Sequence, residues 1–340
     1  MAFLENSLMV ENILDKKKLR MPELDVMKFI GIILVVAGHV TRMYTPQGLI
    51  PTIEHNNVLE FITNVIYSFH MPMFVFVSGM TLAFVSARKS NYHAFWSFVR
   101  NKAKRLMVPY FVFSIFWVLP FMVGYGFREL KTYLLNGIIL SLDCRHLWYV
   151  WMLFDVFILF YILRTIVERF RIPRYYIMIA SLLLYIGEAI GGGGKLPYFQ
   201  IDSMLEYQFW FILGYMTMIY RQETRIMIPI SIIIGFVSAY FYAPISLFTF
   251  ALIGVWLTYL LAQRIRGITE NKTINKIVKN SFGIYLFHPI IIYALYYHFG
   301  KYKPNEYLFA LGVLITSFTI SYFLTEITRK VKLQILIGEK

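Results

Sequence analysis

Long apolar runs alternate along this chain with short polar and basic stretches. Several of the runs approach the ~20 residues that a helix needs to cross the hydrocarbon layer. The pattern predicts an all-α polytopic membrane protein with about ten transmembrane helices. The ten segments cover roughly residues 26–44, 61–86, 107–124, 147–165, 175–190, 206–220, 226–242, 244–262, 281–299 and 306–328. A further apolar piece, Tyr133–Leu142, is too short to span and is expected to be re-entrant or interfacial.

The composition supports the same class. The chain has 340 residues, a mean hydropathy of +0.60, 58% hydrophobic residues and 15% charged residues, which excludes an ordinary soluble globular domain. Residues 1–23 have acids in their apolar part and no cleavage pattern, so they are expected to be a cytoplasmic segment and not a signal peptide. We expect a membrane domain over 24–330 and a cytoplasmic tail over 331–340. Cys144 is the single cysteine, so no internal disulfide is possible.

The net charge of +14 has a topological explanation. If the N-terminus is placed in the cytoplasm, most lysines and arginines fall in the segments on that side, loop after loop. Positive residues collect in cytoplasmic loops of membrane proteins. The charge therefore predicts that both termini are cytoplasmic, and it does not indicate a nucleic-acid partner.

The first apolar segment carries ionisable residues at positions where the bilayer makes them costly. Asp25 and Lys28 lie near its start and His39 lies deep inside it. A helix separates Lys28 from His39 by ~16 Å along its axis. The pair is suited to connecting a group that arrives from one membrane face with chemistry further in. The alternative is a snorkelling lysine and a histidine that only packs between helices.

Two further histidines stand beside prolines inside apolar segments. His70 precedes Pro72, and His288 precedes Pro289. Histidines at similar depth on adjacent helices make a candidate acid–base pair, and His39 with His70 fits that description. The alternative is that His70 and His288 bond to the carbonyls that the prolines leave free. Their spacing matches no zinc motif, so no metal is expected.

The loops add two polar clusters. The run at 100–110 places basic residues, among them Lys104 and Arg105, at the cytoplasmic membrane edge. By itself this run favours lipid headgroup contact over a phosphate-rich ligand. On the other side, an aromatic and polar cluster fits either an interfacial belt or stacking on a sugar. Its members are Arg145, His146, Trp148 and Tyr149, and Glu206 lies at the outer mouth of the sixth segment.

Several of these stretches resemble the integral-membrane acyltransferase-3 family, and most of all its fucose 4-O-acetylase-like branch of sugar O-acyltransferases. In that family a basic residue precedes a histidine by eleven positions, as Lys28 precedes His39. FHMPMFVFVSGM at 69–80 is similar to the second-helix motif. Weaker similarities are KRLMVPY at 104–110, HLWYVWMLF at 146–154, FILGY at 211–215 and SFGIYLFHP at 281–289.

The resemblance implies a transferase for acyl groups other than aminoacyl groups. Its donor would be cytosolic acetyl-CoA or another acyl-CoA such as succinyl-CoA. Its acceptor would be a sugar hydroxyl of an envelope polysaccharide or lipid-linked glycan at a bacterial plasma membrane, so the modification would be an O-acetylation in the usual case. The oligomeric state stays open.

The resemblance also assigns roles to individual residues. His39 would act as general base or acyl carrier, with His70 as the second catalytic residue. The CoA phosphates would dock at Lys28, Lys104 and Arg105. The supporting residues would be Asp25, which would hold Lys28 or Arg105, and His288. The acceptor would contact Ser78, Arg145, His146, Trp148 and Glu206.

A carrier is the rival interpretation. Buried histidines also suit a polysaccharide exporter or a proton-coupled transporter. Transporters often show repeated halves with interrupted helices in matching places, and no convincing repeat is visible here. Acyl-CoA separates the two interpretations, because an acyltransferase binds or cleaves it and a carrier does not.

Overall fold

The computed structural model describes residues 20–339, apart from residues 52, 87–93, 192–193, 195, 221–227, 230–231, 234 and 237–245. Within these residues every regular element is a helix, and no strand is present. The elements are α2 (Pro22–Thr41), η1 (Arg42–Tyr44), α3 (Asn57–Ser86), α4 (Phe95–Phe113), η3 (Ser114–Val118), α5 (Leu119–Gly124), α6 (Leu130–Thr132), η4 (Tyr133–Ile139), η5 (Arg145–Leu147), α7 (Trp148–Arg169), α8 (Tyr175–Gly191), η6 (Tyr198–Gln200), α9 (Ile201–Ile219), α11 (Ser246–Arg264), η8 (Arg266–Glu270), α12 (Lys272–Phe299), η9 (Gly300–Tyr302), α13 (Glu306–Lys330) and η10 (Gln334–Ile337).

Seven helical stretches in the described residues are long and apolar enough to cross a membrane. They are Pro22–Tyr44, Asn57–Ser86, Phe95–Gly124, Arg145–Arg169, Leu247–Arg264, Lys272–Tyr302 and Glu306–Lys330. Each coincides with a predicted segment, so the predicted helical membrane protein is confirmed. Helices α8 and α9 cover two more predicted segments. The segment predicted at 226–242 lies mostly outside the described residues, as does most of 1–23, so the count of ten stays a prediction.

Two helices begin well before their predicted apolar segments. Helix α4 starts at Phe95 and α12 at Lys272, because polar and basic residues in their N-terminal halves interrupt the apolar pattern. The start of α12 has a local cause: the Asn271 side chain accepts hydrogen bonds from the backbone N–H groups of Thr273 and Ile274, which is a typical N-cap. In the short piece at 133–142, residues Tyr133–Ile139 form a π-helix, and Tyr110 donates to the carbonyl oxygens of Gly137 and Ile138 there.

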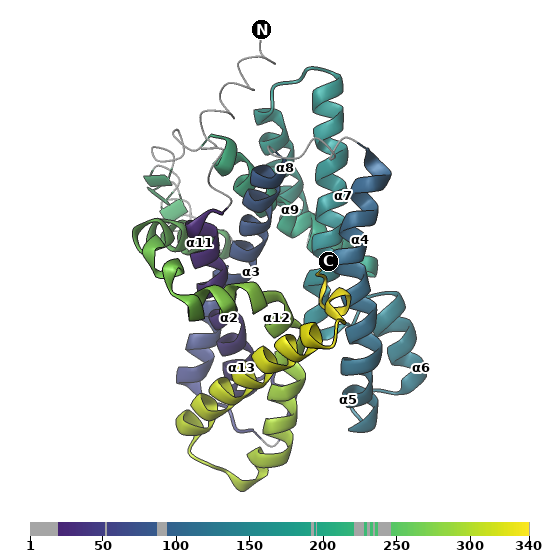
Figure 1. The fold of residues 1–340 in the computed structure, drawn as a ribbon, viewed down its shortest axis with the longest axis vertical. Helices are drawn as coiled ribbons and strands as arrows, with labels where there is room; N and C mark the ends of the chain where they lie inside the picture. The colour runs from purple at the N-terminus through teal and green to yellow at the C-terminus, as the bar shows by residue number, and fades with distance from the viewer. Residues whose placement is uncertain are drawn as a thin grey trace.

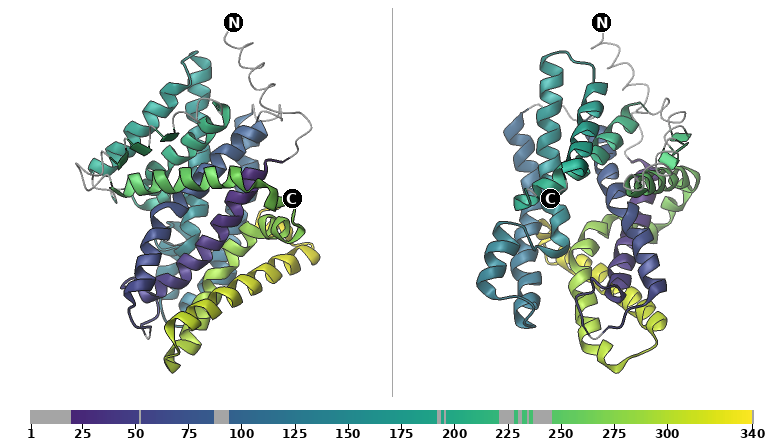
Figure 2. Two further views of the ribbon diagram at one scale, coloured as in Figure 1. Left: turned by 90° about the vertical axis from the view of Figure 1, so that its left-hand side faces the viewer. Right: turned by 180° about the vertical axis from the view of Figure 1, so that it is seen from behind.

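Helix α2 lies at the centre of one side of the molecule. It packs against α3, α11, α12 and α13, which surround it in Figure 1 and in the side view of Figure 2. Val26, Met27 and Val36 are fully buried. Helices α4 to α7 form the other side of the molecule, and α3 and α9 lie between the two sides (Figure 1). Of the polar residues of α2, Glu23 and Thr41 are buried, and Asp25, Lys28 and His39 are partly buried.

Helices α3 and α9 pack at backbone distance through two glycines. A Cβ atom at Gly79 would collide with the carbonyl oxygen of Phe211, and one at Gly214 would collide with the carbonyl oxygen of Phe76. Small residues at helix contacts let membrane helices approach this closely. This contact gives the SGM and FILGY stretches a structural reason for their glycines.

A π-helical turn interrupts the helix that begins at Phe95. It runs from Ser114 to Val118 and ends just before Pro120. Proline lacks the N–H that would continue the regular ladder, and single π turns are common at functional sites. The turn lets Trp117 donate from Nε1 to the carbonyl oxygen of Phe287 on α12, over 3.1 Å.

Candidate active site

Three histidines from distant parts of the chain converge inside the bundle. The rings of His39 on α2 and His288 on α12 are 5.1 Å apart between centroids, and His288 is 6.1 Å from His146 in η5. His146 and His288 are buried and His39 is partly buried. Within the described residues no group of three His, Cys, Asp or Glu side chains has the arrangement of a metal site. We call these three residues the histidine cluster.

The hydrogen bonds of the cluster leave basic nitrogens available. His288 donates from Nδ1 to the Ile284 carbonyl over 2.9 Å, and His146 donates from Nε2 to the Leu286 carbonyl over 3.2 Å. A carbonyl only accepts, so the other nitrogen of each neutral ring carries a lone pair. Those nitrogens, together with Nδ1 of His39, are buried and have no hydrogen-bond partner among the described residues. A hydroxyl group entering the cluster would meet proton acceptors on His146 and His288, beside the unpartnered Nδ1 of His39.

His70 lies beside the cluster, with one aromatic ring in between. Tyr67 is 4.8 Å from His70 and 6.3 Å from His39 between ring centroids. His70 donates from Nδ1 to the Ile66 carbonyl over 2.8 Å, whereas the carbonyl that Pro72 leaves free is that of Ser68. The ring that the structure brings directly against His39 is therefore His288, which the sequence had suggested only as a supporting residue.

Bonds from α12 fix the position of His146. The Tyr285 hydroxyl donates to the His146 carbonyl, while His146 donates back to Leu286. Trp117 of η3 donates to the neighbouring Phe287 carbonyl. The SFGIYLFHP stretch thus contributes His288 and also the groups that hold His146 in position.

The loop before His146 is held in an unusual conformation. Ser141 and Arg145 have positive φ angles of 55° and 54°, and Phe199 and Gln200 opposite them have 56° and 59°. Gln200 donates to the Ser141 carbonyl, and Phe199 donates its N–H to the Leu140 carbonyl over 2.9 Å. Left-handed conformations are uncommon for residues other than glycine and persist where the surroundings hold them. The loop is therefore braced, and sequence analysis gave no sign of it.

Two arginines lie next to the cluster: Arg42 directly follows α2, and Arg145 is the first residue of η5. Arg42 lies one turn after His39, and its Cζ is 5.2 Å from the Tyr67 ring centroid. Arg145 is partly buried and directly precedes His146; its Nε is 3.4 Å from Oδ1 of Asp143. Arg42 and Tyr67 are residues that sequence reasoning missed. Helical periodicity would have found them, since residues three apart share a face.

The other residues predicted to contact the acceptor are Ser78, Trp148 and Glu206, and they lie on three different helices. Trp148 packs on Tyr149, 6.4 Å between centroids, and Tyr149 packs on Tyr285. Ser78 donates to the Phe74 carbonyl of its own helix over 2.9 Å. Glu206 is exposed on α9 next to Tyr207, and the Tyr207 ring stacks near that of Trp148 at 5.4 Å. An aromatic series therefore connects Trp148 with the cluster, and Glu206 lies at its far end.

The opposite end of α2 carries the predicted phosphate-binding residues. Lys28 Nζ is 3.7 Å from Oδ1 of Asp25, and Arg20 Nε is 3.9 Å from Oδ2. Arg105 of α4 is close enough to act electrostatically on Lys28 and also on Lys102. Lys104 is exposed on the same helix. The structure thus pairs Lys28 with Asp25 and places Arg105 within electrostatic range of Lys28. Their role in binding a phosphate stays a prediction.

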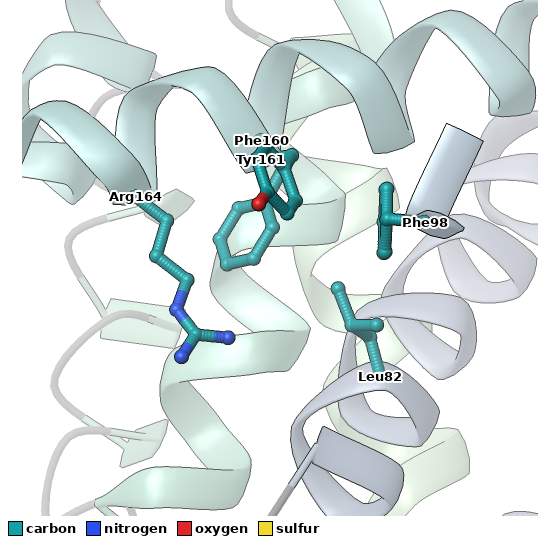
Figure 3. A pocket seen from close by; sticks show the side chains of 5 residues that line it. All are labelled: Leu82, Phe98, Phe160, Tyr161 and Arg164. Carbon is teal, nitrogen blue, oxygen red and sulfur yellow. The ribbon is translucent and has the colours of Figure 1, made fainter. Parts of the chain in front are cut away.

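A small pocket lies next to this basic group. Leu82, Phe98, Phe160, Tyr161 and Arg164 line it (Figure 3). Lys102 connects it with Arg105, because its ammonium group lies 5.5 Å from the Phe98 ring centroid and 3.4 Å from that of Phe157. The pocket combines apolar walls with nearby positive charge.

The fold and the site define a helical membrane protein with a basic group at one end of a central helix and a histidine cluster near the other. The family comparison agrees, since the model of an acyltransferase domain, acyltransferase-3, matches residues 21–326. The chain belongs to the acyltransferase-3 family and is a membrane acyltransferase. No curated protein and no solved structure matches it.

Proposed function

We propose that this protein moves an acyl group, most simply acetyl, from cytosolic acyl-CoA to a hydroxyl of an envelope polysaccharide or lipid-linked sugar at a bacterial plasma membrane. In this proposal the chain has ten spans and both termini in the cytoplasm, so that the Lys28 end of α2 lies on the cytoplasmic side. The observation that carries the proposal is the arrangement of α2, which holds a cation near one end and a histidine cluster near the other, in a chain of this family.

The donor arrives at the Lys28 end. CoA carries phosphates, which arginine and lysine bind through charge-assisted hydrogen bonds, and Lys28 with Arg105 supplies paired cations there. Asp25 holds Lys28 in place. Lys104 extends the basic surface towards solvent. From this end the long thioester arm of the donor reaches along α2 to His39, ~16 Å away.

The reaction takes place at the histidine cluster. A basic nitrogen of His39 removes the proton of the acceptor hydroxyl as its oxygen attacks the thioester carbonyl. The carbon–sulfur bond then breaks, and the histidine returns the proton to the departing CoA thiolate. His288 shares the proton because its ring, whose Nε2 has no partner among the described residues, lies 5.1 Å from that of His39. The products are the sugar ester and free CoA. His70 and Ser78 orient the acceptor or stabilise the oxyanion.

Ester-linked acyl groups in the envelope glycans test the proposal. They are released by mild base from cells that express equal amounts of wild-type protein, His39→Ala or a control. His298→Ala is a matched control, because His298 is exposed and lies on the same helix as His288. We expect ester with wild type and control and its loss in His39→Ala, and the released acid identifies the donor. Equal ester in all three, or no acyl-CoA binding, would favour a carrier.

A further inference from the structure

We infer that the acceptor carries an anionic group, a phosphate or a carboxylate, that docks between Arg42 and Arg145 at the mouth of the histidine cluster. This inference rests on the proposed function and adds to it the charge class of the acceptor. The sequence had suggested Arg145 as a contact to sugar, without a charge requirement.

The two arginines stand next to two histidines of the cluster. Arg42 follows His39 by one turn and is held by the Tyr67 ring and hydroxyl. Arg145 is the residue before His146. Tyr293 of α12 is within electrostatic range of both guanidinium groups. An anion bound to both arginines would hold the rest of an acceptor against the cluster.

The residues that the structure describes balance the charge of Arg145 only in part. Nε and Nη2 of Arg145 are buried and have no hydrogen-bond partner among the described residues. The carboxylate paired with Arg145 is that of Asp143, and its Oδ2 accepts a 2.6 Å hydrogen bond from Arg128. The single negative charge of Asp143 is therefore shared by the guanidinium groups of Arg128 and Arg145. A guanidinium stays charged in proteins and fits a phosphate or carboxylate with two parallel donors.

The placement of Arg145 argues against an interfacial cation that only meets lipid headgroups. Such side chains extend to the membrane surface, whereas 18% of the Arg145 side chain is exposed. Its backbone is held at a φ of 54° by the braced loop described above. Ionisable residues at such depth pair with a partner or mark a substrate path. Arg145 shares the Asp143 carboxylate with Arg128, and an anionic acceptor supplies the further negative charge.

The acylated glycan itself gives the direct test. Cells expressing the protein are labelled with radioactive acetate, and the labelled glycan is applied to an anion exchanger at neutral pH. We expect it to be retained. Hydrofluoric acid, which cleaves phosphodiesters, or carbodiimide-mediated reduction, which removes carboxylates, should abolish retention and so identify the anion. A labelled glycan that flows through would overturn the inference and leave the proposed function intact. No labelled glycan would overturn both.

Variants test the residues. We expect Arg42→Gln and Arg145→Gln to lower ester formation by about tenfold or more through weaker acceptor use, with the dependence on acyl-CoA unchanged. Arg145→Lys keeps the charge and should restore part of the activity, which separates lost binding from lost folding. Lys303→Gln is the control, because it removes an exposed cation near the same end of α2, where Lys303 pairs with Glu54. Wild-type ester levels in both glutamine variants would refute the assignment.

Discussion

The rings of His39 and His288 lie 5.1 Å apart at an angle of 68°, although 248 residues separate them in the sequence. Each has a ring nitrogen without a hydrogen-bond partner among the described residues. A buried polar atom left unpaired costs ~1–3 kcal/mol. Such a cost at two adjacent rings is explained if a substrate hydroxyl supplies the missing bond.

The first prediction follows from this pair. His288→Ala should lower acyl transfer by ~100-fold or more, the usual contribution of a general acid–base group, and it should do so more strongly than His70→Ala. The measurement is ester formation in membranes at equal protein levels, with His298→Ala as the control on α12. If His70→Ala were the more severe variant, the reaction centre would lie on the Tyr67 side of His39.

A second prediction concerns the donor end. Lys28→Ala should raise the acyl-CoA concentration needed for half-maximal transfer by about tenfold, because a charge-assisted contact to phosphate is lost, while the maximal rate changes less. Titration of acyl-CoA in isolated membranes measures both values. Lys332→Ala, an exposed cation after α13, is the matched control. An unchanged CoA requirement in Lys28→Ala would remove Lys28 from the donor site.

Features that depend on residues close together in the sequence could be predicted from it, whereas contacts between distant helices could not. The membrane helices, and Lys28 with His39 on one of them, follow from apolar runs and spacing. The partnership of His39 with His288 depends on packing between α2 and α12, which contacts such as that of the Tyr296 hydroxyl with the Val40 carbonyl hold in place. No periodicity along the chain reports such a contact. Arg42 was within reach of sequence reasoning, since it lies one turn from His39.

The glycine contact between α3 and α9 gives a third prediction. Gly79→Leu and Gly214→Leu should each lower the unfolding temperature strongly, because the added side chain meets backbone and not a movable side chain. Overpacking typically costs ~1–3 kcal/mol, and a backbone clash lies at the upper end. Thermal unfolding followed by size-exclusion chromatography in detergent measures the effect. Gly312→Leu is the control, since a Cβ there meets no atom within 4 Å.

The last prediction uses Cys144 as a probe of the braced loop. Burial raises the pKa of its thiol to about 11, so little thiolate is present at pH 8, and alkylation should be slow. Gln200→Ala removes the donor to the Ser141 carbonyl and should release the loop, which speeds labelling and lowers transfer together. Ser203→Ala at the start of α9 serves as the control, because its hydroxyl donates to Oε1 of Gln200 and leaves the amide nitrogen that holds the loop in place.

The same thiol sets the sign of a pH effect. An unfolded cysteine ionises near pH ~8.5, below the folded value, so between the two the folded protein binds more protons than the unfolded one. Stability should therefore fall as pH rises from about 9 towards 11. Cys144→Ala should remove that part of the decline, and unfolding temperatures measured across this range test it. In the alkylation experiment, equal labelling rates at pH 8 for the wild-type protein and Gln200→Ala would show that Gln200 does not hold the loop closed.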